Sequence, residues 1–201
     1  MKVYKKVPRS EVTGKVISVR WVDINKGDEV NPNYRSRLVA REINTHANPE
    51  MFAATPRTEA LKLMIAIAAT KNAKGQKRRF MVNDVSRAYF YAKAIRKVFV
   101  EIAEEDREPG DENMVGELQY SMYGTRDAAQ NWEEAYSDFM VSVGFAKGLC
   151  SPCVFYHKEK NLRFNQKKNL VNIPTSLSRA LGAVQMQWVF SIPLLKKQKP
   201  N

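Results

Sequence analysis

The C-terminal part of the sequence lacks acidic residues altogether. From Asn161 to Asn201 there is no Asp and no Glu, whereas seven Lys and Arg residues occur in the same stretch. A segment without carboxylates cannot supply the oxygen ligands that magnesium prefers. The same stretch carries seven of the 12 net positive charges of the chain, so part of the basic character belongs to this end alone.

Cysteine and histidine are also scarce. The chain has two of each, and three of the four lie together as Cys150, Cys153 and His157, with His46 far away in the sequence. A structural zinc site needs four ligands. A redox pair is expected at the start of a helix, whereas the residues after Cys153 have the pattern of a strand. The sequence favours two reduced, partly buried thiols over metal or redox chemistry.

Long apolar runs are missing as well. No run approaches the ~20 residues that a membrane-spanning helix requires. The basic segment Met1 to Arg9 has no apolar segment behind it, which excludes a signal peptide. We therefore expect an intracellular protein, in the cytoplasm or nucleus, with no membrane segment.

What remains is typical of a soluble, folded chain. Of the 201 residues, 44% are hydrophobic and 27% are charged, which suits one domain with a core or a fragment of a larger one. Lys and Arg total 33 against 21 Asp and Glu. Such a surplus favours polyanionic partners, nucleic acid first, because each neutralised phosphate releases counterions. A basic surface without a partner, or disordered basic ends, remains the alternative.

Hydrophobic periodicity predicts a mixture of hairpins and packed helices, which indicates the α+β class. Residues 1–14 are basic and without periodicity, and we expect them to be flexible. The expected strands are Val16–Asp23 and Arg37–Arg41 (a hairpin around Lys26-Gly27), Phe80–Val82, Val98–Ile102, Met114–Tyr120 and Cys153–Tyr156, with an acidic surface loop at Glu104–Glu112.

Two helices are expected. The first begins with Thr55 as N-cap and Pro56 in the first turn, and its apolar positions predict a largely buried helix. The second, Asp127–Val143, is amphipathic, and Gly144 ends it. Its apolar side consists of Trp132, Tyr136, Phe139, Met140 and Val143.

The stretch Arg79–Phe90 contains the main catalytic candidate. Phe80 and Val82 alternate with other side chains as in a half-buried strand, and Asp84 follows where the strand ends. A carboxylate at such a position can bind a metal ion, although most Asp residues at strand ends form turns or helix caps.

Asp84-Val-Ser-Arg-Ala-Tyr-Phe90 resembles the palm motif of reverse transcriptases, and further blocks extend the resemblance in family order. The sequence is similar, from about Val16 to Arg163, to copia-type retrotransposon polymerases. Several ordered blocks are far more specific than any one of them. The other blocks are Tyr34–Arg41, Met51–Pro56, Ala60–Thr70, Leu118–Trp132 and Ser151–Phe155.

This resemblance implies the fingers and partial palm of a right-hand polymerase, with an antiparallel sheet backed by helices over residues 15–163. It implies RNA-directed DNA polymerase activity by two-metal nucleotidyl transfer with Mg²⁺, on an RNA or DNA template-primer and deoxynucleotides. Asp84 and the carbonyl of Val85 then become metal ligands, with Asp84 catalytic. The implied nucleotide contacts are Arg37, Arg87, Ala88, Tyr89, Tyr123 and Gly124, and the implied nucleic-acid contacts are Arg35 and Arg41.

Alternatives stay open for several of these residues. Tyr89, expected to crowd a 2′-hydroxyl of the nucleotide, could equally be a core residue. The three arginines of the first hairpin could be solvated charges that protect an edge strand. Asp127 and Ala129 replace the Gln and Pro of the common family pattern, so the details of that loop are not transferable.

The second palm motif, Tyr-Val-Asp-Asp, is absent from the sequence after Phe155. Without its carboxylate pair we expect the chain to be inactive alone. Residues 164–201 are interpreted as an unrelated, poorly ordered basic tail. Two hypotheses follow: a fragment of a copia-type reverse transcriptase, or a non-catalytic basic remnant that binds nucleic acid.

Overall fold

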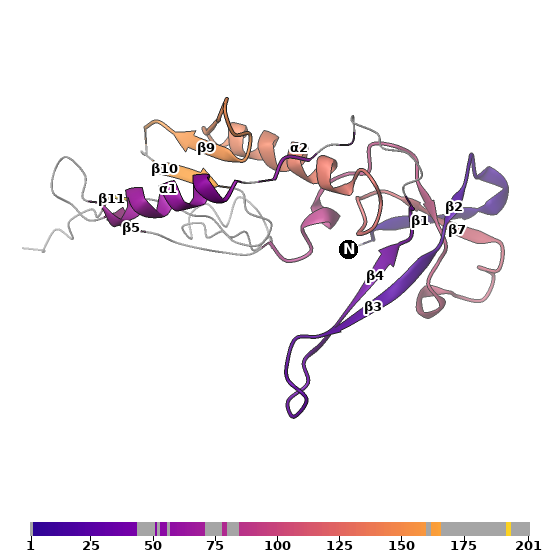
Figure 1. Cartoon of the computed structure of the whole chain (residues 1–201). Helices are drawn as coiled ribbons and strands as arrows, with labels where there is room; N and C mark the ends of the chain where they lie inside the picture. Colours follow the sequence, from indigo (N-terminus) through magenta and orange to yellow (C-terminus); the bar gives the residue numbers. More distant parts are fainter. Residues whose placement is uncertain are drawn as a thin grey trace, which may run out of the picture. The chain divides into compact units, whose positions relative to one another are not determined.

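The computed structural model describes residues 2–43, 51, 53–55, 57–70, 85–159 and 162–165 with their side chains, and 78–79 and 192–193 by their backbone. The chain is mixed α+β, in agreement with the class predicted from sequence (Figure 1). It divides into two compact units, which we describe separately. Unit 1 comprises Met1–Ala53 and Ala88–Ala135, and unit 2 comprises Ala54–Arg87 and Tyr136–Asn201.

Unit 1 contains a four-stranded sheet in the order β1-β7-β6-β2. The strands β1 and β6 both pair with β7 in antiparallel fashion, whereas β2 runs parallel to β6. The predicted strands around Val100 and Val115 are confirmed, although β6 is shorter than expected. The bounds are β1 Tyr4–Pro8, β2 Val16–Ile17, β6 Phe99–Val100 and β7 Met114–Leu118.

The flexible N-terminus expected from sequence differs from the structure, because Tyr4–Pro8 pair with β7 along their whole length. A 3₁₀ turn, η1 (Arg9–Glu11), follows this strand. The sequence of this strand, Tyr-Lys-Lys-Val-Pro, has little apolar character. Only Val7 is buried, and Tyr4 is half-buried. Pairing with a buried neighbouring strand provides the order that the local sequence does not indicate.

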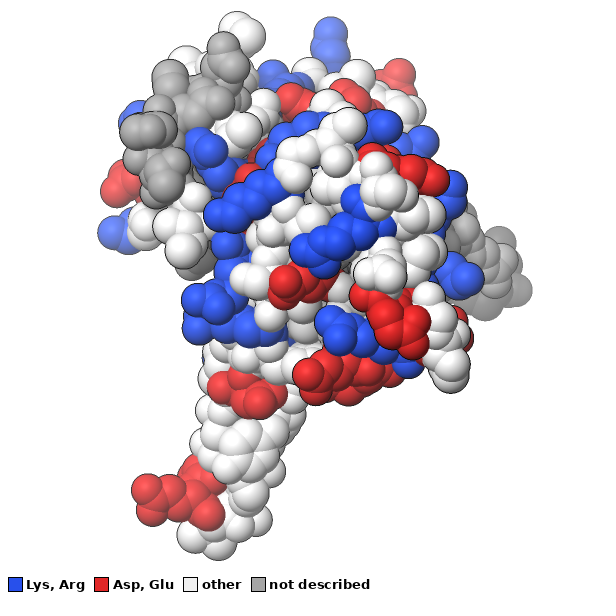
Figure 2. Space-filling model, turned by 90° about the vertical axis from the view of Figure 1, so that its right-hand side faces the viewer, with Lys and Arg blue, Asp and Glu red and all other residues white. Residues whose placement is uncertain are grey.

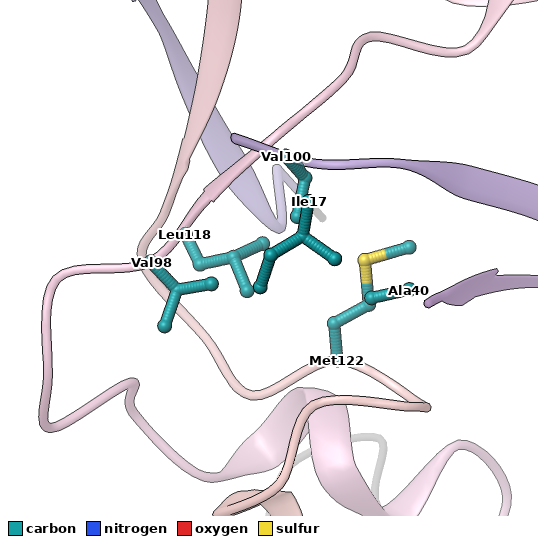
Figure 3. Packing of buried hydrophobic residues seen from close by; sticks show 6 residues of the cluster. All are labelled: Ile17, Ala40, Val98, Val100, Leu118 and Met122. Carbon is teal, nitrogen blue, oxygen red and sulfur yellow. The ribbon is translucent and has the colours of Figure 1, made fainter. Parts of the chain in front are cut away.

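Both faces of this sheet bury apolar residues, because neighbouring residues of a strand point to opposite sides. On one face Val7, Phe99 and Val115 pack together. On the other face lies a second cluster, drawn in Figure 3. It consists of Ile17, Ala40, Val98, Val100, Leu118 and Met122.

The predicted hairpin is confirmed. Strands β3 (Val19–Asn25) and β4 (Tyr34–Ala40) pair antiparallel, and the ribbon extends away from the rest of unit 1 (Figure 1). In the loop, the side-chain oxygen of Asn25 accepts hydrogen bonds from the backbone N–H groups of Gly27 and Asn33. At the base, Leu38 and Ala40 pack against the second core cluster, which anchors the ribbon to the sheet.

Unit 2 contains a three-stranded antiparallel sheet in the order β10-β9-β8 and a separate two-stranded pair. Its core includes Tyr136, Phe155 and Phe164, whose ring centroids lie 5.5–5.8 Å apart. Helix α2 contributes its first turns to unit 1 and the remainder to unit 2. The bounds are α1 Thr58–Ala69, β5 Arg78–Arg79, α2 Ala128–Ser142, β8 Ala146–Lys147, β9 Val154–His157, β10 Leu162–Asn165 and β11 Ile192–Pro193.

The first helix begins later than predicted and is less buried. Its N-cap position is Arg57, without a capping side-chain hydrogen bond, so Thr55 is not the N-cap. Met64 is the only residue of α1 that is buried, and Leu63 is 61% exposed. The helical period places Leu63 away from the face that Met64 shares with the half-buried Leu61. The sequence therefore identified the helix but overestimated its apolar face.

The second helix agrees with its prediction. It ends at Ser142, and Gly144 has a φ of +92°, the left-handed conformation that a helix end commonly adopts. Tyr136 and Met140 are buried on the expected side. The strand at Val154–His157 is also confirmed. Next to it, Cys153 is buried and donates a hydrogen bond to the carbonyl of Ala54 at 3.4 Å, whereas Cys150 is exposed, and neither forms a disulfide.

Some expectations fall on residues that the structure does not describe. These include the strand Phe80–Val82, Asp84 itself and almost all of the expected tail after residue 165. Among the described helices, none is long and apolar enough to cross a membrane.

Candidate nucleotide site and basic hollows

Three of the residues expected to contact a nucleotide meet around one turn of unit 1. The guanidinium carbon of Arg37 lies 5.7 Å from the ring centroid of Tyr123. The ring of Tyr89 lies 4.8 Å from the same ring at an angle of 51°. Phe90 contacts it edge-on, with centroids 5.5 Å apart. We call these four residues the Tyr123 cluster.

The position of Tyr123 follows from its neighbours. Met122 is only 2% exposed and belongs to the core, so the next side chain is directed out of that core. Gly124 has a φ of +87°, and a Cβ atom there would lie 2.0 Å from the carbonyl oxygen of Ala40. The N–H of Ala40 donates to the carbonyl of Tyr123 at 2.8 Å. The turn is thus pressed against the end of β4, the strand that carries Arg37.

The other two aromatic side chains come from η3 (Ala88–Tyr91), a 3₁₀ turn. Phe90 packs against the second core cluster and so anchors the turn. Tyr89 is half-buried, and burial raises the pKa of its hydroxyl, which is therefore protonated and able to donate a hydrogen bond at neutral pH. The expected contact between Tyr89 and a nucleotide sugar stays a prediction.

The three arginines that the sequence grouped differ in their surroundings. Arg35 and Arg37 lie on the same face of the ribbon, where they pair with Ile24 and Val22 of β3. Arg20 shares this face because it pairs with Val39. Arg41 lies beyond the strand, where its N–H donates to the carbonyl of Ser18, and its side chain lines a hollow of about 610 Å³.

The expected metal site cannot be assembled from the described residues. Asp84 lies outside them, and the described part of the chain contains no group of three His, Cys, Asp or Glu residues that could hold an ion. Val85 is half-buried and Arg87 is exposed with a φ of +59°, and both belong to unit 2. The described residues therefore do not test the expected two-metal site, and no step is assigned to a metal.

An ion-pair network near the Tyr123 turn was not predicted from the sequence. Arg96 donates to Glu42 at 2.5 Å and to Asp127 at 2.9 Å. The second oxygen of Asp127 accepts a hydrogen bond from the side chain of Asn131, and Glu42 accepts one from the N–H of Arg126. The network therefore joins the end of β4, the segment before β6 and the start of α2.

The charges of this network are mutually stabilised. Burial alone would raise the pKa of the Asp127 carboxyl, but the hydrogen bond and charge of Arg96 outweigh it and the pKa is lowered. Burial likewise disfavours the charged form of Arg96, and its two carboxylate partners raise the pKa of the guanidinium above its ordinary value. One feature of the sequence could have indicated this network. Asp127, the residue before helix α2, replaces the Gln of the common family pattern.

The side chains of the Tyr123 cluster can bind a nucleotide, but they provide no reacting group. Aromatic faces stack on nucleobases, and a guanidinium binds phosphate through paired hydrogen bonds. The described carboxylate nearest in sequence to the turn, Asp127, is already bound by Arg96 and Asn131.

Comparisons with known proteins identify the family of the chain. A family model described as "Reverse transcriptase (RNA-dependent DNA polymerase)" matches residues 1–164. The chain is 23% identical over 147 residues to "Retrovirus-related Pol polyprotein from transposon TNT 1-94" of Nicotiana tabacum. That match covers 71% of this chain and 11% of the relative, so the chain spans about a ninth of the relative's length. No solved structure matches the chain. The chain belongs to the reverse transcriptase family, as a domain of the copia type.

Proposed function

We propose that the chain forms the fingers and part of the palm of an RNA-directed DNA polymerase, and that the Tyr123 cluster binds the incoming deoxynucleoside triphosphate. The observation that carries this proposal is the meeting of Arg37, Tyr89 and Tyr123 at a turn where only glycine fits next.

Each member of the cluster has a separate task. Arg37, exposed on the ribbon, binds the triphosphate through charge-assisted hydrogen bonds. The Tyr123 ring offers a face to the base or sugar, and one base–aromatic stack contributes about 1–3 kcal/mol. Tyr89, fixed through its neighbour Phe90, lies where an aromatic ring crowds a 2′-hydroxyl and so favours deoxynucleotides.

Nucleotide binding by this chain does not imply that it adds nucleotides to a primer. Two-metal nucleotidyl transfer needs several converging carboxylates, and the sequence contains no Asp-Asp pair. We therefore expect the chain to bind nucleotides without extending a primer unless carboxylates are supplied from outside it. Magnesium would enter through Asp84 and the carbonyl of Val85, which remain the proposed ligands.

The test is equilibrium binding of a fluorescent deoxynucleoside triphosphate to the full chain. Arg37→Gln should weaken binding about tenfold or more, because a charge-assisted hydrogen bond contributes roughly 1.5–3 kcal/mol. Lys26→Gln, which removes one charge from the loop of the same ribbon, is the matched control and should leave the affinity unchanged. Equal effects of the two variants would contradict a site at Tyr123.

Primer extension with Mg²⁺ or Mn²⁺ tests the second half of the proposal. We expect no incorporation by this chain alone. Incorporation that disappears in Asp84→Asn would show that the chain is a complete catalyst and would overturn the expectation of inactivity.

A second function, non-catalytic binding of nucleic acid, is favoured by the charge of unit 2, which holds 18 Lys and Arg residues against four Asp and Glu. It predicts that an oligonucleotide still binds to Arg37→Gln when deoxynucleotide binding is lost. Loss of both activities in that variant would argue against it.

A further inference from the structure

We propose that the hydrogen bond between Trp21 and Glu105 positions the β3–β4 ribbon for nucleotide binding. It holds the ribbon where Arg37 reaches the ring of Tyr123. The proposal deepens the proposed function and rests on it, because the ligand is the deoxynucleoside triphosphate assigned to the Tyr123 cluster. The indole N–H of Trp21 donates to Oε1 of Glu105 at 3.0 Å. The two residues are 84 positions apart in the sequence, and both belong to unit 1.

Trp21 and Arg37 lie on opposite faces of the ribbon at neighbouring rungs. Trp21 pairs with Leu38, whereas Arg37 pairs with Val22. Because successive side chains of a strand point to opposite faces, Arg37 and Leu38 are on different sides. On one face the indole binds the turn after β6, and on the other the guanidinium carbon lies 5.7 Å from the ring centroid of Tyr123. A tilt of the ribbon about its base therefore changes both contacts together.

Core packing supports the ribbon only up to the residue next to Arg37. Leu38 and Val39 are half-buried, and Leu38 packs against the second core cluster. All residues from Asp23 to Arg37 are exposed. A two-stranded ribbon is only marginally stable by itself in water. The orientation of Arg37 therefore depends on contacts outside the ribbon, and Trp21 supplies one of them at the neighbouring rung.

Glu105 is a well-placed acceptor because its turn is attached to the sheet. It lies in η4 (Glu104–Asp106), a 3₁₀ turn that follows β6. From β1, Lys6 donates to the carbonyl of Asp106 at 2.7 Å, and the hydroxyl of Tyr4 donates to the Asp106 carboxylate. Strand β1 in turn pairs with β7 along its whole length. The indole is therefore bound, through this turn, to the four-stranded sheet.

The position of Glu105 also explains part of the acidic segment. Six carboxylates occur between Glu104 and Glu112. In Figure 2 a group of acidic side chains lies beside the base of the projecting ribbon. Asp106 and Asp111 bind side chains of β1, whereas Glu105 binds the ribbon. The segment that the sequence identifies as an acidic surface loop thus joins β1 to the ribbon.

The charge of Glu105 strengthens the contact. Its own backbone N–H and the indole of Trp21 lower the pKa of the carboxyl, so Glu105 is ionised at neutral pH. A hydrogen bond to an ionised acceptor is stronger than one between neutral groups. Water competes with it, however, because Trp21 is 47% exposed and Glu105 is also exposed. We therefore expect a moderate effect on nucleotide affinity.

The test measures binding of a fluorescent deoxynucleoside triphosphate to the full chain. Trp21→Phe keeps an aromatic ring but removes the donor, and Glu105→Ala removes the acceptor. Each should weaken binding about two- to tenfold, the range that corresponds to one net hydrogen bond. The double variant should lose no more than either single variant, because both substitutions remove the same contact. Glu105→Gln keeps an acceptor oxygen and should bind the nucleotide more tightly than Glu105→Ala.

Two further comparisons test whether the contact acts through Arg37. In an Arg37→Gln background, Trp21→Phe and Glu105→Ala should cause no further loss of affinity. Glu104→Ala is the matched control, because it removes an exposed carboxylate from the same turn, and it should not weaken binding. Additive losses in the double variant, a full loss in the Arg37→Gln background, or equal losses in Glu104→Ala and Glu105→Ala would each overturn the proposal.

A measurement without nucleotide separates this proposal from the proposed function. The fluorescence of Trp21 is the difference between each variant and its Trp21→Phe counterpart, and quenching by acrylamide reports how accessible the indole is. Quenching should increase in Glu105→Ala and stay unchanged in Glu104→Ala, and unchanged quenching in Glu105→Ala would contradict the contact. Increased quenching with unchanged nucleotide affinity would overturn the positioning role, whereas normal affinity in Arg37→Gln would overturn the proposed function.

Discussion

Unit 1 and unit 2 differ most in their balance of charge. Unit 1 has 15 basic and 17 acidic residues, whereas unit 2 has 18 basic and four acidic residues. The formal net charge of +12 therefore comes entirely from unit 2. The ion pairs described for Lys6, Arg96 and Lys97 nevertheless lie in unit 1, where the net charge is close to zero. Net charge indicates attraction to polyanions, but it does not locate a site.

In unit 1, charges of opposite sign are placed in contact. Lys6 binds Asp111 at 2.6 Å and Glu108 at 3.2 Å, which lowers the pKa of the Asp111 carboxyl through its hydrogen bond with the amine. Tyr4 donates to Asp106, and burial together with this bond raises the pKa of the tyrosine. Such pairs fix loops at defined places. Unit 2, in contrast, has only four acidic residues for its 18 basic ones, too few to pair with most of its positive charges.

The largest expected effect comes from Gly124→Ala, which should disrupt the contact between the turn at Tyr123 and the end of β4. The added Cβ would lie 2.0 Å from the carbonyl oxygen of Ala40 and 2.6 Å from Cγ1 of Val39, at a φ of +87°. Backbone strain and overpacking together should lower the free energy of unfolding by about 3–4 kcal/mol. Urea denaturation measures this loss, and deoxynucleotide binding should disappear with it.

Gly110→Ala is the matched control for this prediction. Gly110 has a φ of +101°, but a Cβ there meets no atom within 4 Å. Only the backbone strain applies, so we expect a loss of about 1 kcal/mol and normal nucleotide binding. Equal losses in the two variants would show that the contact between the turn and β4 has no energetic importance.

An intermediate effect is expected from Arg96→Met. The substitution leaves Glu42 and Asp127 as partly buried carboxylates without their cation, and their side chains are 15% and 10% exposed. Breaking a fully buried pair typically costs about 3–5 kcal/mol, and because the side chain of Arg96 is 34% exposed we expect about 2–3 kcal/mol at pH 7. Arg96→Lys, which retains the charge, should lose less.

The pH dependence of this loss follows from the lowered pKa of Asp127. A depressed folded-state pKa contributes stability above the unfolded-state pKa, and that contribution is lost as the pH falls through the folded-state value. The gap between the unsubstituted chain and Arg96→Met should therefore narrow on acidification below the ordinary Asp value of 3.8. A gap that stays constant between pH 7 and pH 3 would contradict a role for ionised Asp127.

Much of the fold of unit 1 could be predicted from local pattern. The hairpin, the strand at Val115 and the helix after Asp127 all have the alternation or period that their burial requires. The strand at Tyr4–Pro8 could not be predicted, because long-range pairing with β7 orders it. The overestimated burial of α1 has a related cause: hydrophobicity indicates that a face can be buried, but not what covers it.

The candidate site was predictable only in part. The family motif supplied Arg37, Tyr89 and Tyr123, and the structure brings them together. The Arg96 network depends on residues far apart in the sequence: Glu42 and Arg96 are 54 positions apart, and no local pattern links them. The basic stretch after Asn161, in contrast, indicates an interaction at the C-terminal end and not in unit 1.

The smallest effect concerns single charges of unit 2. If its positive charges act together and without defined partners, then Lys62→Gln on α1 and Lys158→Gln after β9 should weaken oligonucleotide binding equally. Both residues are exposed. Each should lower the log–log salt slope by no more than about 0.7, the contribution of one phosphate contact, and leave thermal unfolding unchanged. Anisotropy titrations at several salt concentrations measure the slopes. A several-fold larger effect of one of the two variants would show that unit 2 contains a localised site, and the contrast with unit 1 would then be wrong.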